Sequence, residues 1–200
     1  METITVKTKV YDFSELSEES QQKAIDNNRD MNTDHDWSDC EQEDFKTIAG
    51  LMGISIENIY FSGFSSQGDG ACFTGNYEYK KGSVKAVKEY APKDETLHQI
   101  VESLAKAQKP NFYGLEARVE HRGHYYHSLS NSIEVRNENT QLWYAEEPEQ
   151  SDDIREALRD FMNWMYTSLE NQYDYLTGDE CVKESLITNE YRFTEAGQIF

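Results

Sequence analysis

Three histidines within seven residues form the densest group of side chains in this sequence that could do acid–base or metal chemistry. They lie in the segment His121-Arg122-Gly123-His124-Tyr125-Tyr126-His127. If Arg122-Gly123 is a two-residue turn, His121 faces His124 across a hairpin, whereas His127 lies on the opposite face. A closed zinc site takes four ligands, and two histidines are too few. We therefore predict no bound metal at this segment.

The alternative for this segment is an exposed hairpin tip that serves as a contact or ligand surface, formed by His121, His124 and Tyr126. Tyrosines next to polar side chains are enriched in such surfaces. A hydrolase or metal-dependent enzyme would use His121, His124 and nearby carboxylates, but no complete nucleophile or metal constellation accompanies them. We expect a protein that is not an enzyme and has no cofactor, and the enzyme alternative stays open.

A glycine-rich segment from Gly63 to Gly70 is the second candidate for chemistry. A phosphate-binding P-loop has Lys followed by Ser or Thr after its second glycine. Asp69 stands where the lysine belongs, and its carboxylate would repel phosphate. The segment therefore indicates the turn of a hairpin, because glycine adopts positive φ readily. The residues that would line a small-ligand pocket in the alternative interpretation are Gln67, Gly68, Asp69 and Gly70.

Negative charge dominates the composition. The 200 residues carry 38 Asp and Glu against 19 Lys and Arg, a net charge of -19. Such a chain repels nucleic acid and anionic membranes, so we expect neither as a direct partner. A charge-driven partner is basic, and the ordinary alternative is that the charge only keeps the protein soluble.

The acidic residues gather in two stretches, 26–44 and 146–160. Neither has the alternating acids and the glycine of a calcium-binding EF-hand loop. Solvated helix faces are one explanation, and a surface that imitates the phosphate charge of DNA is the functional one. The predicted partner-binding residues are Asp30, Asp34, Asp36, Asp39, Glu41, Glu43, Asp44, Glu146, Glu147, Asp152 and Asp153.

Cysteine usage and the apolar pattern predict a cytoplasmic protein. Cys40, Cys72 and Cys181 are far apart and odd in number, which favours reduced thiols over disulfides. The first residues show no basic and apolar leader pattern, and no apolar run approaches the ~20 residues that span a bilayer.

Hydrophobic spacing predicts strands paired as hairpins and several helices. Ser17 is the expected N-cap of a first helix that runs to about Arg29, and Asp94 is the expected cap of another that ends before Pro110. The expected hairpins are 54–65 with 71–80, and 115–120 with 124–135 around Arg122-Gly123. The longest helix follows Pro148 and has a continuous apolar stripe. Together these elements predict a single α+β domain, residues 1–200, in which helices pack on an antiparallel sheet built from β-hairpins.

Four stretches together resemble a known family. They are Tyr11 to Ser17, Tyr60 to Gly75, His121 to His127 and Asn189 to Thr194, of which Ser66-Gln67-Gly68-Asp69-Gly70 is the most distinctive. The set is similar to small acidic proteins carried by bacteriophages and prophages, sometimes labelled antitoxin-like. The resemblance implies a viral origin and action in the cytoplasm of a bacterial host. It implies no activity and no catalytic residues.

Charge and resemblance together lead to one expected function and three alternatives. We expect a non-enzymatic phage accessory protein whose acidic surface binds and inhibits a basic host protein or complex, of the nucleic-acid-binding defence type. The alternatives are a small-ligand or nucleotide-binding protein, an antitoxin that neutralises a partner toxin, and the enzyme considered above. The sequence leaves the oligomeric state open.

Overall fold

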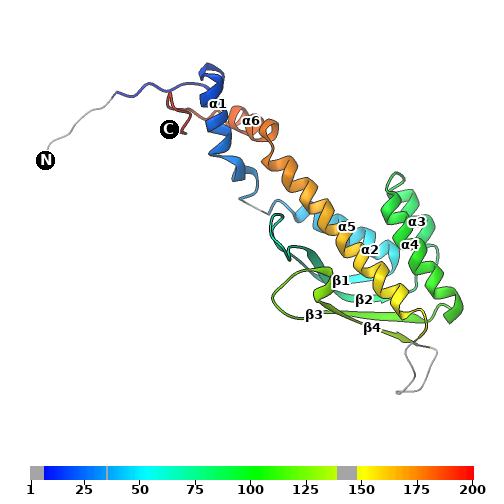
Figure 1. Ribbon diagram of the computed structural model, residues 1–200. Helices are drawn as coiled ribbons and strands as arrows, with labels where there is room; N and C mark the ends of the chain where they lie inside the picture. The colour runs from blue at the N-terminus through cyan, green and yellow to red at the C-terminus, as the bar shows by residue number, and fades with distance from the viewer. Residues whose placement is uncertain (1–6, 35, 139–147) are drawn as a thin grey trace. The chain divides into compact units, whose positions relative to one another are not determined.

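A computed structural model describes residues 7–34, 36–138 and 148–200 of the chain. Its helices and strands in chain order are η1 (Phe13–Glu15), α1 (Glu18–Asp26), η2 (Arg29–Asn32), α2 (Asp39–Met52), β1 (Ile54–Phe61), β2 (Ala71–Glu78), α3 (Ser83–Tyr90), α4 (Glu95–Gln108), η3 (Lys109–Asn111), β3 (Leu115–His121), η4 (Ser128–Ser130), β4 (Asn131–Asn137), α5 (Ser151–Thr177) and α6 (Asp179–Thr188), where η marks a 3-10 helix. The predicted α+β class is confirmed (Figure 1).

The chain divides into two compact units. Unit 1 consists of Met1–Ser38 and Asn171–Phe200, and unit 2 consists of Asp39–Glu170. Helix α5 contributes its first part to unit 2 and its last residues to unit 1. The expectation of one domain over residues 1–200 stays a prediction.

Unit 2 contains a four-stranded antiparallel sheet in the order β1-β2-β3-β4. The predicted first hairpin is confirmed, with Tyr60 opposite Cys72 and Phe61 opposite Ala71. A β-bulge interrupts the pairing of β1 between Ile56 and Asn58. Because each strand is antiparallel to the next, the β1–β2 and β3–β4 connections lie at the same end of the sheet, and they carry the glycine and histidine segments. At the other end, α3, α4 and η3 connect β2 to β3.

Alternation of apolar and charged residues decides which face of the sheet is buried. In β3, Ala117 and Val119 are buried, whereas Arg118 between them is exposed. In β4, Ile133 and Val135 are buried, whereas Glu134 is exposed. A period of two is the pattern of a half-covered antiparallel sheet. One face therefore packs on the helices, and the opposite face is open.

The helices of unit 2 cover the apolar face of the sheet (Figure 1). The ring of Phe161 on α5 meets that of Phe73 on β2 at a centroid distance of 6.1 Å. Farther along α5, Trp164 stacks on Phe161, contacts Phe45 of α2 and donates a hydrogen bond to Asp94, which caps α4 through the backbone amide of Leu97. The predicted Asp94 cap is confirmed, and the same carboxylate also joins α4 to α5.

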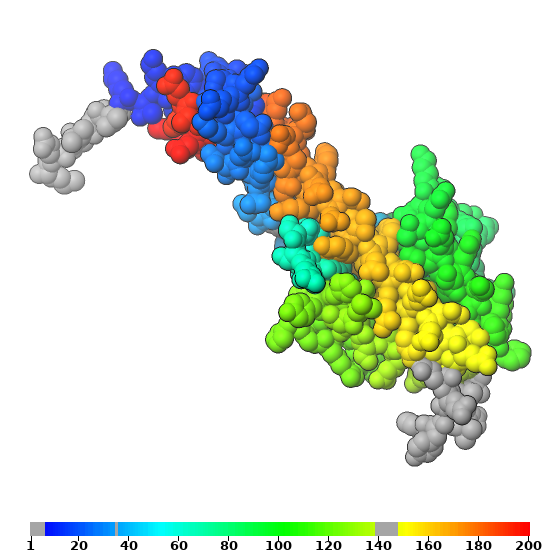
Figure 2. Space-filling view, in the orientation of Figure 1, coloured from blue at the N-terminus to red at the C-terminus, as the bar shows by residue number. Residues whose placement is uncertain are grey.

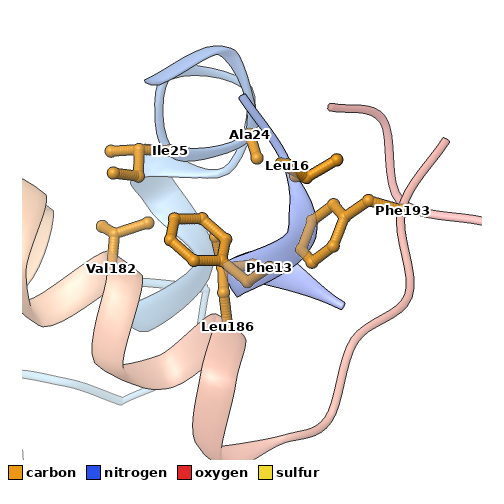
Figure 3. Packing of buried hydrophobic residues seen from close by; sticks show 7 residues of the cluster. All are labelled: Phe13, Leu16, Ala24, Ile25, Val182, Leu186 and Phe193. Atoms are coloured by element: carbon orange, nitrogen blue, oxygen red, sulfur yellow. The ribbon is translucent and has the colours of Figure 1, made fainter. Parts of the chain in front are cut away.

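Unit 1 has a small core of its own (Figure 3). Phe13 and Phe193 meet edge to face at 5.9 Å, and Val182 and Leu186 of α6 pack on the same cluster. The predicted Ser17 cap is confirmed, since its hydroxyl accepts a hydrogen bond from the backbone amide of Ser20. The core of unit 1 thus joins residues from both ends of the chain.

In the described ranges 7–34, 36–138 and 148–200, no helix combines the length and the apolar character needed to cross a membrane.

Candidate functional site

The connection between β1 and β2 is organised by the carboxylate of Asp69. One of its oxygens accepts hydrogen bonds from the backbone amides of Ser65 and Ser66, at 3.1 and 2.6 Å. Gly68 has a φ of +97°, a conformation that glycine adopts without a steric penalty. The segment is therefore a turn, as expected, and Asp69 holds the turn together through its side chain.

The structure brings the glycine segment against the histidine segment, although they are about fifty residues apart in sequence. A Cβ atom added to Gly70 would lie 2.9 Å from Cα of His127 and 3.1 Å from the carbonyl oxygen of Tyr126. A Cβ atom added to Gly68 would contact the ring of Tyr125. Glycine at position 70 is thus required by the close approach of two backbones, and Gly68, Gly70 and Tyr126 belong to one loop cluster.

The predicted turn at Arg122-Gly123 is wrong. Strand β3 ends at His121 and β4 begins at Asn131, which is the residue opposite His121. The intervening residues form a longer connection that includes η4. His124 is exposed and does not face His121, while Nδ1 of His127 accepts a hydrogen bond from the backbone amide of Leu129. The three histidines consequently occupy three different environments. No group of three metal-ligating side chains occurs in the parts of the chain that the structure describes.

His121 lies in an aromatic cluster with Tyr60 and Tyr126. The two tyrosine rings stack at 5.4 Å, and each lies 5.3 Å from the imidazole. Tyr60 comes from β1 and Tyr126 from the β3–β4 connection, so the cluster joins two segments of the unit. The sequence analysis missed Tyr60, and the register of the first hairpin would have found it, because Tyr60 pairs with Cys72 at the end of the sheet.

Cys72, His121 and Asn131 lie close together, and cysteine, histidine and asparagine can form a catalytic triad. The geometry of these three side chains opposes that chemistry. Nδ1 of His121 lies 3.3 Å from Oδ1 of Asn131 and 3.8 Å from Sγ of Cys72. An Nδ1 that donates its proton to Asn131 has no lone pair with which to take the thiol proton. Burial raises the pKa of the Cys72 thiol to about 11, which opposes formation of the thiolate. These contacts therefore do not support Cys72 as an activated nucleophile.

The opposite ring nitrogen, Nε2 of His121, is buried and has no hydrogen-bond partner among the described residues. The residue His121 lines a hollow of about 360 Å³ on the open face of the sheet. Arg118, Glu120 and Arg122 line the hollow, and Glu120 forms ion pairs with both arginines at 2.9 and 3.3 Å. Aromatic side chains thus line one part of the hollow, and ion-paired side chains line another. A small polar ligand could bind to both kinds of group.

The predicted acidic residues lie at separate places. Asp30, Asp34 and Asp36 are exposed in unit 1, and Asp152 and Asp153 are exposed on the first turn of α5. Glu146 and Glu147 lie outside the described residues. The remaining four belong to the start of α2 and are named here the α2 carboxylates: Asp39, Glu41, Glu43 and Asp44.

The α2 carboxylates and the two predicted acids of α5, Asp152 and Asp153, do not form one surface. Phe45 of α2 contacts Trp164, and Trp164 is about 18 Å along the axis of α5 from Asp152, at a rise of about 1.5 Å per residue. Within the α2 group, Asp44 accepts a hydrogen bond from the hydroxyl of Tyr90, and Glu43 pairs with Lys46 at 2.7 Å. One carboxylate oxygen of Glu41 is buried without a partner in the described part of unit 2.

Comparison with known proteins places the chain in a family without assigning an activity. No curated protein and no solved structure matches the chain. A family model described as a domain of unknown function (DUF8835) matches residues 37–179, which include all of unit 2 and therefore both loop segments, the open sheet face and the α2 carboxylates. The chain belongs to the DUF8835 family.

Proposed function

We propose that this protein is a non-enzymatic inhibitor that binds a basic, nucleic-acid-binding protein of a bacterial host through the α2 carboxylates, in the host cytoplasm. The observation that carries the proposal is the presentation of these side chains on a rigid helix. Asp39, Glu43 and Asp44 are exposed, whereas Phe45 and Ile48 on the other side of the same helix are buried. A charged surface on a packed helix keeps its geometry when it meets a partner, so little entropy is lost on binding.

The charge of the whole chain supports the same partner class. A net charge of -19 attracts a basic groove over several ångströms and raises the rate of encounter at low ionic strength. The resemblance to acidic phage and prophage proteins supports a host target of the defence type, and nucleic-acid-binding defence proteins carry basic grooves. Occupation of such a groove by carboxylates would exclude the nucleic acid.

The first experiment compares three forms of the tagged protein as bait for bacterial lysate. They are the natural sequence, an α2 variant with Asp39→Asn, Glu43→Gln and Asp44→Asn, and a matched α5 variant with Asp152→Asn, Asp153→Asn and Glu156→Gln. Both variants remove three exposed carboxylates, so they change the net charge of the chain equally. Asn at position 44 also keeps an acceptor for the hydroxyl of Tyr90.

We expect a basic protein to be retained by the natural sequence and by the α5 variant at about 0.1 M salt. It should be lost with the α2 variant, and lost from all three baits at about 1 M salt, where the Debye length falls from about 10 to about 3 Å. Equal loss in both variants would reduce the effect to overall charge and contradict the proposed surface. If the natural sequence retains no protein at either salt concentration, the proposed inhibitor function is contradicted.

A second candidate function is favoured by the hollow on the open sheet face. There, Tyr60 and His121 end a space of about 360 Å³, and the buried Nε2 of His121 has no partner in the described chain. A small polar ligand such as a nucleotide would stack on the tyrosine and accept from Arg118 or Arg122.

The second candidate is tested by thermal unfolding with a panel of nucleotides and divalent metal ions. A ligand that binds only the folded state raises the melting temperature in proportion to its occupancy. The matched variant is Tyr60→Ala, which removes the stacking ring and should abolish the shift. A panel without any shift would rule out the nucleotides tested as ligands of this hollow.

A further inference from the structure

Phe112 is held in a conformation that costs stability and exposes its ring. It is 87% exposed, the most exposed of the large hydrophobic side chains that the structure describes. Its φ is +52°, and that of the following Tyr113 is +63°. Left-handed backbone is unfavourable for residues with a Cβ atom, and Phe112 adopts it as the C-cap of η3.

The surrounding contacts hold this connection rigidly. The buried side chain of Gln108 donates to the carbonyl of Leu115 at 2.7 Å and accepts from its backbone amide at 3.0 Å. The amide of Asn111 donates to the side chain of Gln150 at 2.6 Å. The ring of Tyr113 packs on that of Tyr79 at 4.5 Å. Phe112 is thus a fixed aromatic projection, which is the property of a binding anchor.

Phe112 follows the part of the sequence that is richest in lysine. Seven of the twelve lysines lie between residues 80 and 109, where there are four acidic residues. Lys109 begins η3 directly before Phe112, and Lys80 and Lys81 follow the Tyr79 that packs on Tyr113. All three lysines are exposed. We call Phe112 with these three lysines the basic knob, and its chemistry fits a surface that offers carboxylates beside an exposed apolar side chain.

Unit 2 contains such a surface in a hollow at a different place, between η4 and the first half of α5, where the two segments lie side by side in Figure 2. Its volume is about 520 Å³. Leu129, which is 69% exposed, lies on one side. The exposed carboxylates of Asp152, Glu156 and Asp160 lie on the other, together with Arg155, which pairs with Asp152 at 2.9 Å. We call this space the acidic hollow.

Arg159 also lines the acidic hollow, and its guanidinium forms no ion pair with a described residue. Its Nε atom is buried without a hydrogen bond in the described chain. Every other described arginine has a carboxylate within ion-pair distance, whereas none is recorded for Arg159 among the described residues. A half-buried guanidinium without an ion pair favours an incoming aromatic face and a carbonyl oxygen, and a strained loop with an exposed phenyl ring offers both.

We propose that the basic knob of one copy of this chain binds the acidic hollow of a second copy. The phenyl ring of Phe112 packs on Leu129 and over the guanidinium of Arg159, and the three lysines face Asp152, Glu156 and Asp160. The lysines bring positive charge to Glu156 and Asp160, which have no ion pair among the described residues, and Leu129 offers the ring an apolar contact. Because knob and hollow are different patches, the contact is head to tail, and it builds rings or chains instead of a twofold dimer.

The test measures the mass of the untagged protein by sedimentation velocity over a range of concentrations at low salt. We expect masses above the 23.3 kDa of one chain, rising with concentration and falling when salt is added. Phe112→Gly should be monomeric and should melt at a higher temperature, because glycine relieves the left-handed backbone. A natural sequence that stays monomeric, or a glycine variant that associates equally well, overturns the proposal.

A mixing experiment tests the head-to-tail arrangement. A hollow variant with Glu156→Lys and Asp160→Lys should also be monomeric, whereas a control with Glu180→Lys and Glu184→Lys, of equal charge and on α6, should associate at least as well as the natural sequence. A mixture of the Phe112→Gly and hollow variants should form a pair that does not grow further, since each contributes one intact patch. A mixture that remains monomeric, or a natural sequence that stops at a dimer, contradicts the arrangement.

Discussion

Two charged regions of unit 2 differ in what they do to the stability of the fold. The α2 carboxylates stand at the N-terminal end of a helix, where negative charge interacts favourably with the helix dipole. Their presence has a structural explanation besides any role in binding. In the basic knob, the left-handed backbone of Phe112 ends η3, but the exposed phenyl ring at that position makes no contribution to a buried core.

The α2 carboxylates are thus explained by their contribution to folding. The exposed ring of Phe112 makes no such contribution and needs another explanation. Two phenylalanines make the contrast concrete, since Phe45 beneath the α2 carboxylates is 1% exposed and Phe112 is 87% exposed. Removal of the first should destabilise the protein, and removal of the second should not. The predictions below test this contrast, from the largest expected effect to the smallest.

Phe45→Ala should lower the free energy of unfolding by about 3–5 kcal/mol, because it leaves a cavity against Trp164. Chemical denaturation followed by tryptophan fluorescence measures the change. The matched variant Phe112→Ala should change the free energy of unfolding by less than about 0.5 kcal/mol, as expected of an exposed side chain. Equal losses in the two variants would contradict the contrast.

Raising the pH should weaken the support of the basic knob. Burial raises the pKa of Tyr77 from an ordinary value near 10.0 to about 12, and the hydroxyl of Tyr77 accepts a hydrogen bond from Gln108. The stability contributed by neutral Tyr77 is complete below pH 10 and is lost as the pH rises from 10 to 12. The loss amounts to about 3 kcal/mol at two pKa units.

Unfolding curves between pH 9 and pH 12 measure this loss, with Tyr77→Phe as the control that lacks the ionising group. The variant should lose less stability over the same interval. Identical pH profiles for the two proteins would show that Tyr77 ionises as freely as an exposed tyrosine.

Neutralisation of the α2 carboxylates should have a small effect on the fold. Asp39→Asn removes a negative charge from the first turn of α2 and should cost about 0.3–1 kcal/mol. The control Asp160→Asn, in the middle of α5, should cost less, since it lies outside the reach of the helix end. Thermal melting of both variants at low ionic strength checks the order, and a reversed order would remove the dipole explanation.

Phe112→Gly should have a similarly small effect on stability, with the opposite sign. Relief of the left-handed strain favours the folded state by about 1–2 kcal/mol, and the flexible unfolded glycine offsets about 0.5–1 kcal/mol of that gain. The net expectation is a stabilisation of about 0.5–1 kcal/mol, measured by denaturation at a concentration where the chain is monomeric. A destabilised variant would mean that Phe112 contributes to folding.

The sequence predicted the elements that depend on local signals. Ser17 and Asp94 cap their helices because a short polar side chain before an amphipathic run accepts hydrogen bonds from the first free backbone amides. The hairpin of β1 and β2 followed from two alternating runs with glycines between them. These features involve residues close in sequence, and their physical causes are contained in the segment itself.

The candidate site depends on contacts between segments that are far apart in the sequence, and a short stretch of sequence does not predict such contacts. The turn at Arg122-Gly123 was predicted from composition, and Gly123 does have a positive φ of 107°. The chain nevertheless continues to Asn131 before it pairs, because the connection packs on Gly70 from another hairpin. The left-handed Phe112 was equally invisible, since the nearby Gly114 would be the expected residue for positive φ and does not adopt it.

The measurement that tests the central claim most directly is the association rate of the captured partner with the natural protein, the α2 variant and the α5 variant, as a function of ionic strength. The account predicts that the rate for the natural protein and the α5 variant falls at least about tenfold from low to physiological salt. The α2 variant should start slower and depend much less on salt. Superimposable curves for the three proteins would contradict the assignment of the binding surface to α2.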